Sequence, residues 1–373
     1  MLKKMKNTDI TLIILTAVCC IGGILLTFSM AYNSKYQNIT SGNPSSSWKT
    51  TLIAAAIGTV ACIIIAKLGI RRIKKLWWLA AVIGLVGVAL TFTSLGVGPS
   101  GSDDIAWLRF KGFTIQPSEI LKLCFILSFS VHINKVKANL NKPFVLLGLL
   151  AHAAVPVALV CLQGDQGTAV VFIIIALIML FAGGIKWQYV LTVILLSPVI
   201  LWTVWSFFLQ EHQKKRILIL FNPELDPLGT GYQQIQGKKA IVNGGLWGKG
   251  LFSGRTEEFV YVSEAQNDFI FSYIGQTLGI VGCIAVAALL FFICIKILIN
   301  STKCDTLGAE VCAGVMGLIF SHSVINIGMV LGFMPVIGIP LPFFSAGGTA
   351  MITMLIAIGM VLSCLYANQK TKK

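Results

Sequence analysis

The feature that most constrains this chain is a series of apolar runs, each about as long as a membrane-spanning helix. About 20 apolar residues are needed to cross the ~30 Å hydrocarbon core of a bilayer as a helix. Charged residues make up only 12% of the sequence, whereas a soluble domain carries roughly 25% and needs them on its surface. The runs lie near residues 10–32, 50–68, 76–95, 118–134, 144–162, 166–184, 187–209, 269–299, 308–333 and 345–366. The sequence therefore predicts an all-α polytopic membrane protein, a single domain over residues 1–373 with about ten transmembrane helices.

The distribution of basic residues predicts that both ends of the chain lie in the cytoplasm. Lys3, Lys4 and Lys6 precede the first apolar run. This run is longer than the core of a signal peptide and has no small-residue cleavage site, so we expect a retained helix. With this orientation, seventeen of the 29 Lys and Arg residues fall in cytoplasmic segments and five in short external ones, as the positive-inside rule requires.

Acidic residues are concentrated on the predicted external side, since only Asp9, Asp305 and Glu310 lie inside. Acidic residues do not determine topology, so this imbalance indicates a working surface on the external face. The net charge of +15 does not indicate nucleic-acid binding, because the basic residues sit at the ends of loops. The ten cysteines form no CxxC motif. His132 and His212 are expected at the membrane interface and His152 and His322 are expected to be packing residues, and no pair of histidines has metal-ligand spacing.

The longest polar stretch is an external loop over about residues 210–268, between the seventh and eighth predicted helices. Simple connectors are usually a handful of residues long, so a loop of this length is predicted to be functional. A disordered linker is the alternative, but the loop's Tyr, Trp and Ile content argues against it. Asp268 ends the loop immediately before an apolar run. A carboxylate at this position is either a functional group or the N-cap of the next helix.

Further charged residues lie at the external ends of the predicted helices. Glu119 and Lys122 are three residues apart at the start of the fourth helix, so they share a helix face and can form an ion pair. The alternative is a capping box. Asp165 lies in the tight turn between the fifth and sixth helices, where ordinary turn chemistry is the alternative.

The stretch from Gly332 to Thr349 contains three prolines and repeated glycines in an apolar setting, which excludes a regular helix. Irregular backbone at membrane depth persists only where protein or a water-filled cavity covers it. The sequence therefore predicts a re-entrant segment lining a cavity, with an irregular external turn as the alternative.

These segments, in this order, resemble the shape, elongation, division and sporulation (SEDS) family, which includes RodA, FtsW and SpoVE. The similar motifs are Trp107 with Gln116-Pro117-Ser118-Glu119, Gly164-Asp165-Gln166-Gly167-Thr168-Ala169, Gln213 to Arg216 with Asn222-Pro223 and Gly231-Tyr232-Gln233, Gly244-Gly245-Leu246-Trp247-Gly248-Lys249-Gly250, Asp268-Phe269-Ile270-Phe271, and Pro335 to Gly348. The resemblance covers about residue 90 to the C-terminus.

What the resemblance implies is a peptidoglycan glycosyltransferase that polymerises lipid II at the outer face of the bacterial cytoplasmic membrane. Its implied partner is a class B penicillin-binding transpeptidase. The family's catalytic aspartate falls on Asp268, and its charged cavity residues fall on Glu119, Lys122 and Asp165.

The chemistry of such a reaction agrees with these residue types. A sugar hydroxyl attacks an anomeric carbon and expels undecaprenyl diphosphate, which requires a base and either cations or a divalent metal such as Mg²⁺ or Mn²⁺ to hold the leaving group. Asp268 is the candidate base. The candidate diphosphate ligands are the basic residues Arg109, Lys111, Lys122, Lys215, Arg216 and Lys249.

Departures from the family pattern keep two other functions open. Ala106 stands where an Arg is usual, Ser263 where a Pro is usual, and Gln276-Thr277 where two acidic residues are usual. These changes allow a non-catalytic scaffold that activates its transpeptidase. Broken helices and buried charges also suit a lipid II flippase or another transporter. The motifs do not distinguish elongation, division and sporulation.

Overall fold

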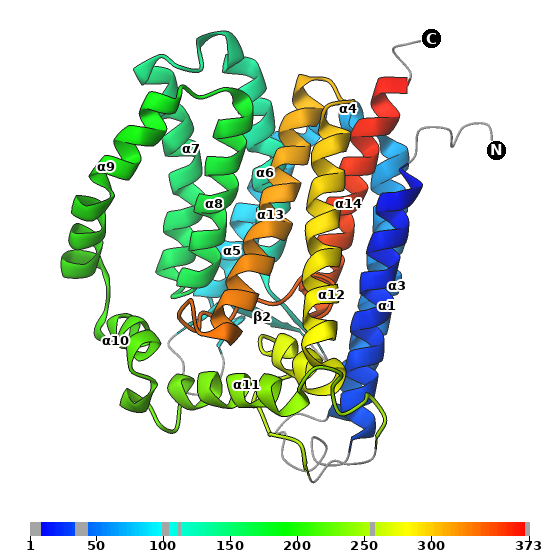
Figure 1. Cartoon of the computed structure of the whole chain (residues 1–373). Helices are drawn as coiled ribbons and strands as arrows, with labels where there is room; N and C mark the ends of the chain where they lie inside the picture. Colours follow the sequence, from blue (N-terminus) through cyan, green and yellow to red (C-terminus); the bar gives the residue numbers. More distant parts are fainter. Residues whose placement is uncertain (1–8, 34–43, 99–103, 111–112, 254–257, 370–373) are drawn as a thin grey trace.

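The chain forms a bundle of long helices with a cap of shorter elements at one end (Figure 1). The computed structural model describes residues 9–33, 44–98, 104–110, 113–253 and 258–369. The long helices are α1 (Ile10–Tyr32), α3 (Pro44–Leu68), α5 (Trp77–Ala89), α6 (Pro117–Val136), α7 (Pro143–Leu162), α8 (Gln166–Gly183), α9 (Trp187–Thr203), α12 (Ile270–Ser301), α13 (Thr306–Leu331) and α14 (Gly348–Gln369). Short helices α4 (Ile70–Ile73), η2 (Lys74–Leu76) and η3 (Leu90–Phe92) extend α5 at its two ends, η4 (Lys137–Asn139) follows α6, and the π-helix η5 (Val204–Phe208) follows α9.

Nine helices of the described chain are long and apolar enough to cross a membrane, and their positions match nine of the ten predicted spans. The tenth, α6, is 20 residues long but carries Glu119 and Lys122 within its first two turns. It packs against α5, α7, α8, α13 and α14. Because protein covers α6 on most sides, its charged residues need not face lipid, and it completes the ten-helix frame.

Ion pairs support the predicted sidedness of the bundle. Each of the three acidic residues expected in the cytoplasm lies beside a basic residue expected there. The pairs are Asp9–Lys296 at 3.2 Å, Arg71–Asp305 at 3.9 Å and Lys137–Glu310 at 3.8 Å. In Figure 1, α1 begins and α14 ends at this same end of the bundle. Both ends of the chain therefore lie on the same side of the membrane, as an even number of crossings requires.

The opposite, external end is capped by elements that hydropathy did not reveal. A three-stranded antiparallel sheet consists of β1 (Gly96–Val97), β2 (Trp107–Phe110) and β3 (Phe113–Ile115). The 210–268 loop contains α10 (Glu211–Phe221), η6 (Pro223–Leu225) and α11 (Thr230–Gly244), and α11 packs across α12 and α13 (Figure 1). The disordered-linker alternative is therefore wrong for the described part of this loop.

A break in α12 is closed by the glycine-rich loop that follows α11. Gly279 has φ +69°, so the helical hydrogen bonds are interrupted there. The backbone N–H groups of Lys249 and Gly250 donate to the carbonyls of Gln276 and Thr277, both at 2.9 Å. A β-carbon at Gly279 would lie 2.3 Å from the Leu246 carbonyl oxygen. This contact explains why glycine is required where the two segments meet.

Helix α9 stands apart from the bundle. None of its residues is buried, and in Figure 1 it lies at the left edge of the molecule. Its side chains are almost entirely apolar, as expected for a helix that contacts lipid around most of its circumference.

Candidate active site

Asp268 lies in a tight turn that leads into α12 at the external end of the bundle. The N-cap of α12 is Phe269, and no side chain caps this helix end. Within the described residues, none donates a hydrogen bond to the Asp268 carboxylate. The side chain is partly exposed. The N-cap alternative is therefore wrong, and the carboxylate is free to act on another molecule.

The irregular segment between α13 and α14 holds the Asp268 turn in place. The Ser345 hydroxyl donates to the Asn267 carbonyl at 2.7 Å, and the Ala346 N–H donates to the Gln266 carbonyl at 2.8 Å. The Asn326 amide of α13 donates to the carbonyls of both Asp268 and Ile339, each at 2.7 Å. These hydrogen bonds attach the Asp268 turn to the irregular segment and to α13.

The large hydrophobic residues in the second half of this irregular segment are buried. Ile339, Leu341, Phe343 and Phe344 are at most 2% exposed. Phe343 has φ +67°, a conformation that costs energy for a bulky residue and persists only where packing enforces it. The predicted re-entrant character is thus supported by burial, and the alternative of a simple external turn is not.

Glu119 and Lys122 form a buried ion pair at the start of α6. The Lys122 Nζ atom lies 2.7 Å from Glu119 Oε1, and the two side chains are 0% and 1% exposed respectively. The N-cap of α6, Gln116, makes no side-chain capping bond, so the predicted pair is confirmed and the capping box is not formed. A buried ion pair is costly to form and costly to break on one side only.

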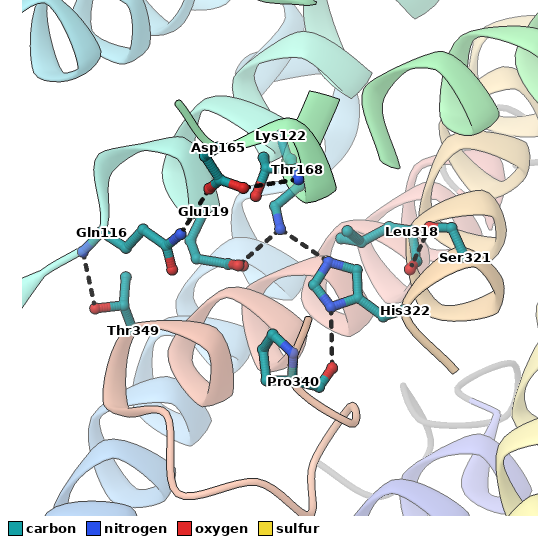
Figure 2. A network of polar contacts seen from close by, with 10 residues as sticks. All are labelled: Gln116, Glu119, Lys122, Asp165, Thr168, Leu318, Ser321, His322, Pro340 and Thr349. Atoms are coloured by element: carbon teal, nitrogen blue, oxygen red, sulfur yellow. Dashed lines mark hydrogen bonds and ion pairs between the residues drawn. The ribbon is translucent and has the colours of Figure 1, made fainter. Parts of the chain in front are cut away.

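Asp165 caps α8 and also joins this polar network. Its Oδ1 accepts from the Thr168 N–H at 2.9 Å, and its Oδ2 accepts from the Gln116 amide at 3.1 Å (Figure 2). The Gln116 N–H also donates to the Thr349 hydroxyl of α14 at 3.4 Å. Ordinary N-cap chemistry and participation in the network therefore coexist at this residue.

The Asp268 turn and the polar network meet across residues 337–339. A β-carbon at Gly338 would lie 3.3 Å from Asp268 Oδ2, and one at Gly167 would lie 2.5 Å from the Ile337 carbonyl oxygen. Gly167 is in the first turn of α8, directly after Asp165 and Gln166. Close approach at these two glycines brings the carboxylates of Asp165 and Asp268 near enough for their charges to interact.

This arrangement shifts the proton affinity of both carboxyls. Burial raises the pKa of Asp268 to about 7, and the nearby charges of Glu264 and Asp165 contribute in the same direction. Burial also raises the pKa of Asp165, while its hydrogen bonds from Thr168 and the Lys122 charge act against that shift. A general base works best when its pKa is close to the working pH, and Asp268 meets that condition.

The other predicted basic ligands are less closely grouped. Lys215 pairs with Asp226 at 3.4 Å and Lys249 with Glu258 at 2.9 Å, both within the 210–268 loop. Arg109 lies exposed on β2, and Lys111 lies outside the described residues.

Arg216 is placed nearer to the network than these. Its guanidinium lies 3.9 Å from Asp104 Oδ2. A β-carbon at Gly164, next to Asp165, would lie 2.7 Å from Asp104 Oδ1. The structure therefore brings Asp165 close to Asp268 on one side and to the Lys122–Glu119 pair on the other, with Arg216 at the edge of the group.

The carboxylates alone do not form a metal site. In the part of the chain that the structure describes, no group of three His, Cys, Asp or Glu side chains could hold a metal ion. Mg²⁺ usually keeps several waters and is bound by one or two carboxylates together with substrate phosphates. Asp165 and Asp268 fit a divalent cation only in that shared form.

Two residues of this network were not predicted from sequence. His322 was expected to be a packing residue, but its Nε2 atom lies 2.8 Å from Lys122 Nζ (Figure 2). Gln116 was noted only as part of a motif. Asn326 and His322 are four residues apart and therefore share one face of α13, which is the one sequence signal that could have drawn attention to His322.

Comparisons with known proteins identify the family. The FtsW/RodA/SpoVE family model, described as "Cell cycle protein", matches residues 9–370. The peptidoglycan glycosyltransferase MrdB of Escherichia coli (strain K12) is 32% identical over 322 residues, covering 84% of this chain and 84% of MrdB. A probable peptidoglycan glycosyltransferase FtsW of Geobacter metallireducens is 28% identical over 370 residues, covering 97% of this chain and 96% of that protein.

Solved structures show the same fold. The rod shape determining protein RodA of Thermus thermophilus superposes with a TM-score of 0.68 at 21% identity, covering 99% of each chain. A chain from a structure described as "Structural coordination of polymerization and crosslinking by a peptidoglycan synthase complex" superposes with a TM-score of 0.74 at 24% identity, covering 96% of this chain and 98% of that one.

Proposed function

The chain belongs to the FtsW/RodA/SpoVE family of cell cycle proteins and is a peptidoglycan glycosyltransferase of the cytoplasmic membrane, and we propose that it extends glycan strands from lipid II with Asp268 as the general base. The observation that carries this proposal is the Asp268 carboxylate. It is partly exposed, accepts no hydrogen bond from the described residues and has a pKa of about 7. Such a group can take a proton from an incoming sugar hydroxyl near neutral pH.

The bond changes follow from this role. The acceptor hydroxyl oxygen attacks the anomeric carbon of the donor sugar as Asp268 removes the hydroxyl proton. A new glycosidic C–O bond forms, and the bond between that carbon and the diphosphate breaks on the opposite side, which inverts the anomeric centre. The lipid diphosphate leaves with the bonding electron pair. We assign the stabilisation of its charge to Lys122, which is buried beside Glu119, and to Arg216, which is partly exposed.

A divalent cation fits the proposal as a companion to the diphosphate. Asp165 and Asp268 are the carboxylates that would share it with phosphate oxygens, since no described cluster holds a metal alone. Its contribution would be neutralisation of charge on the leaving group. Removal of Mg²⁺ and Mn²⁺ with a chelator is expected to slow polymerisation by wild-type protein.

Of the departures from the family pattern, Gln276, Thr277 and Ala106 are buried, whereas Ser263 lies partly exposed in the turn that contains Asp268. Gln276 and Thr277 lie at the break in α12, where both side chains are fully buried and both backbone carbonyls bind the glycine-rich loop. Any residue that fits this space supplies those carbonyls. Ala106 is also buried, at 3% exposed. These positions therefore give no reason to prefer the scaffold alternative over the enzyme.

We propose a class B penicillin-binding transpeptidase as the partner. A solved structure of the same fold comes from a complex described as coordinating polymerization and crosslinking. The two activities follow one another, because the glycan strand made by the glycosyltransferase is the substrate that the transpeptidase crosslinks.

The deciding experiment is polymerisation of lipid II by purified protein, with and without the partner and divalent cation. The wild-type protein is expected to produce glycan strands. The Asp268→Asn variant is expected to polymerise lipid II ~10²–10⁴-fold more slowly. Glu224→Gln makes the same acid-to-amide change at an exposed residue of η6 and serves as the control. Lipid II scrambling without glycan strands would support the transporter instead. Restoration of cell shape by the Asp268→Asn variant would support the scaffold.

A further inference from the structure

His322 contacts two separate parts of the site from the middle of the bundle. It lies on α13, is 0% exposed, and was not expected to take part in the chemistry. Its Nε2 atom is 2.8 Å from Lys122 Nζ on α6, and its Nδ1 atom is 3.2 Å from the Pro340 carbonyl oxygen (Figure 2). Both ring nitrogens are therefore engaged with groups far away in the sequence.

The partners determine where the imidazole carries its proton. A carbonyl oxygen only accepts hydrogen bonds, so Nδ1 must carry a proton to donate to Pro340. A lysine ammonium only donates, so Nε2 must be unprotonated to accept from Lys122. The neutral Nδ1–H tautomer is the single form that satisfies both contacts. His322 is thus an acceptor for the Lys122 ammonium and a donor to the irregular segment.

Lys122 is held by two fixed acceptors but retains further capacity. Its ammonium carries three donors, of which Glu119 Oε1 takes one at 2.7 Å and His322 Nε2 takes another. Glu119 Oε2 is buried without a hydrogen-bond partner among the described residues. Lys122 therefore has one donor, and Glu119 one acceptor oxygen, beyond the bonds that hold them in place.

The same face of α13 supports Asp268. His322 and Asn326 are four residues apart, and they bind the adjacent carbonyls of Pro340 and Ile339. Asn326 also donates to the Asp268 carbonyl. One helix face therefore connects to the Lys122 ammonium through His322 and to the Asp268 turn through Asn326. The irregular segment is bound at two consecutive residues between them.

From this connection we infer that His322 is a positioning residue, which holds the Lys122 ammonium at a set place relative to Asp268 so that the donor diphosphate and the base are aligned together. The inference rests on the proposed role of Lys122 as a diphosphate ligand. A free lysine has four rotatable bonds and loses considerable entropy when it is fixed. With His322 in place, much of that loss occurs before substrate binds.

Substitution of His322 tests this role. His322→Leu removes both contacts, and kcat/KM for lipid II is expected to fall on the order of 10- to 100-fold, since small misplacements of a positioned group have effects of this size. His322→Gln offers an acceptor oxygen and a donor nitrogen, so it is expected to recover most of the rate.

A matched control lies next in the chain. Ser321 is also fully buried, but its hydroxyl donates only to the Leu318 carbonyl of its own helix (Figure 2). Ser321→Ala is expected to keep the wild-type rate. If His322→Leu does not accumulate in the membrane, His322→Asn replaces it, because the shorter side chain can reach only one of the two partners.

A double-mutant cycle separates positioning from a general packing effect. Lys122→Gln removes the positive charge but keeps an N–H donor for Glu119. If His322 acts through Lys122, then His322→Leu causes little further loss of kcat/KM in the Lys122→Gln chain. Losses that multiply would show that His322 acts independently of Lys122, and an unchanged rate for His322→Leu alone would show that its contacts do not matter to the reaction; either result would overturn the inference.

The outcomes also distinguish this inference from the proposed function. Full activity of Lys122→Gln would remove Lys122 from diphosphate binding and would overturn the inference, while the role of Asp268 would still be decided by the Asp268→Asn variant. Loss of activity in Lys122→Gln, together with wild-type activity in His322→Leu, would overturn the inference alone. Inhibition by inorganic pyrophosphate is a second readout, since His322→Leu is expected to raise the inhibition constant while Ser321→Ala leaves it unchanged.

Discussion

Polymerisation by this protein is expected to fall steeply as the pH is lowered below neutrality. Burial raises the pKa of Asp268 to about 7, with added contributions from the charges of Glu264 and Asp165. A general base must be deprotonated to act, so the active fraction is lost as the pH falls through this value. A group of pKa about 7 is ~10% ionised at pH 6 and ~90% ionised at pH 8. The value of kcat/KM should therefore change about ninefold between these pH values.

Substitution of the neighbouring Glu264 is a second way to change the pKa of Asp268. Glu264 is exposed and acts on Asp268 through its charge. Glu264→Gln removes that charge and is expected to lower the pKa of Asp268, so the acid limb of the profile moves to lower pH and the relative rate at pH 6 rises. Glu211→Gln, an exposed change on α10, should leave the profile where it is.

The assay is the initial rate of glycan formation from subsaturating labelled lipid II between pH 5.5 and 8.5, because kcat/KM reports the free enzyme. Thermal unfolding in the same buffers checks that the protein remains folded. A flat profile across this range, with folded protein throughout, would refute the assignment of Asp268 as a base with a raised pKa. An acid limb that Glu264→Gln does not move would refute the electrostatic explanation.

Four further substitutions test the residues that support the site. Lys122→Met leaves the Glu119 carboxylate buried and unpaired, so the free energy of unfolding in detergent should fall by ~3–5 kcal/mol. Adding Glu119→Leu should restore most of that stability but not activity. Ser345→Ala removes the hydroxyl that bridges the Asp268 turn and the irregular segment, and kcat should fall on the order of tenfold while membrane levels stay unchanged. Gly279→Ala places a side chain at φ +69° against a carbonyl oxygen, and thermal unfolding should show a loss of at least ~1–2 kcal/mol.

Several parts of the site could be read from local sequence because the relevant physics is local. The Glu119–Lys122 pair follows from helical spacing alone. Asp268 stood out because a carboxylate bordering an apolar run is costly. The role of the basic residues could not be read in this way. Lys215 and Lys249 lie in the loop that was predicted to be functional, but each forms an ion pair with an acidic residue of that same loop. Ion pairs within a folded loop follow no sequence period, so they could not be predicted.

Hydropathy and charge asymmetry by themselves determined that the chain crosses a bilayer about ten times with both ends inside, because the cost of placing polar groups in hydrocarbon acts on each segment separately. Only the tertiary structure decided what surrounds Asp268. His322 is 200 residues away from Lys122 in the chain, and the glycine loop meets the broken α12 through backbone groups that carry no side-chain signature. Such contacts depend on how distant helices pack together, and no local pattern of residues specifies that packing.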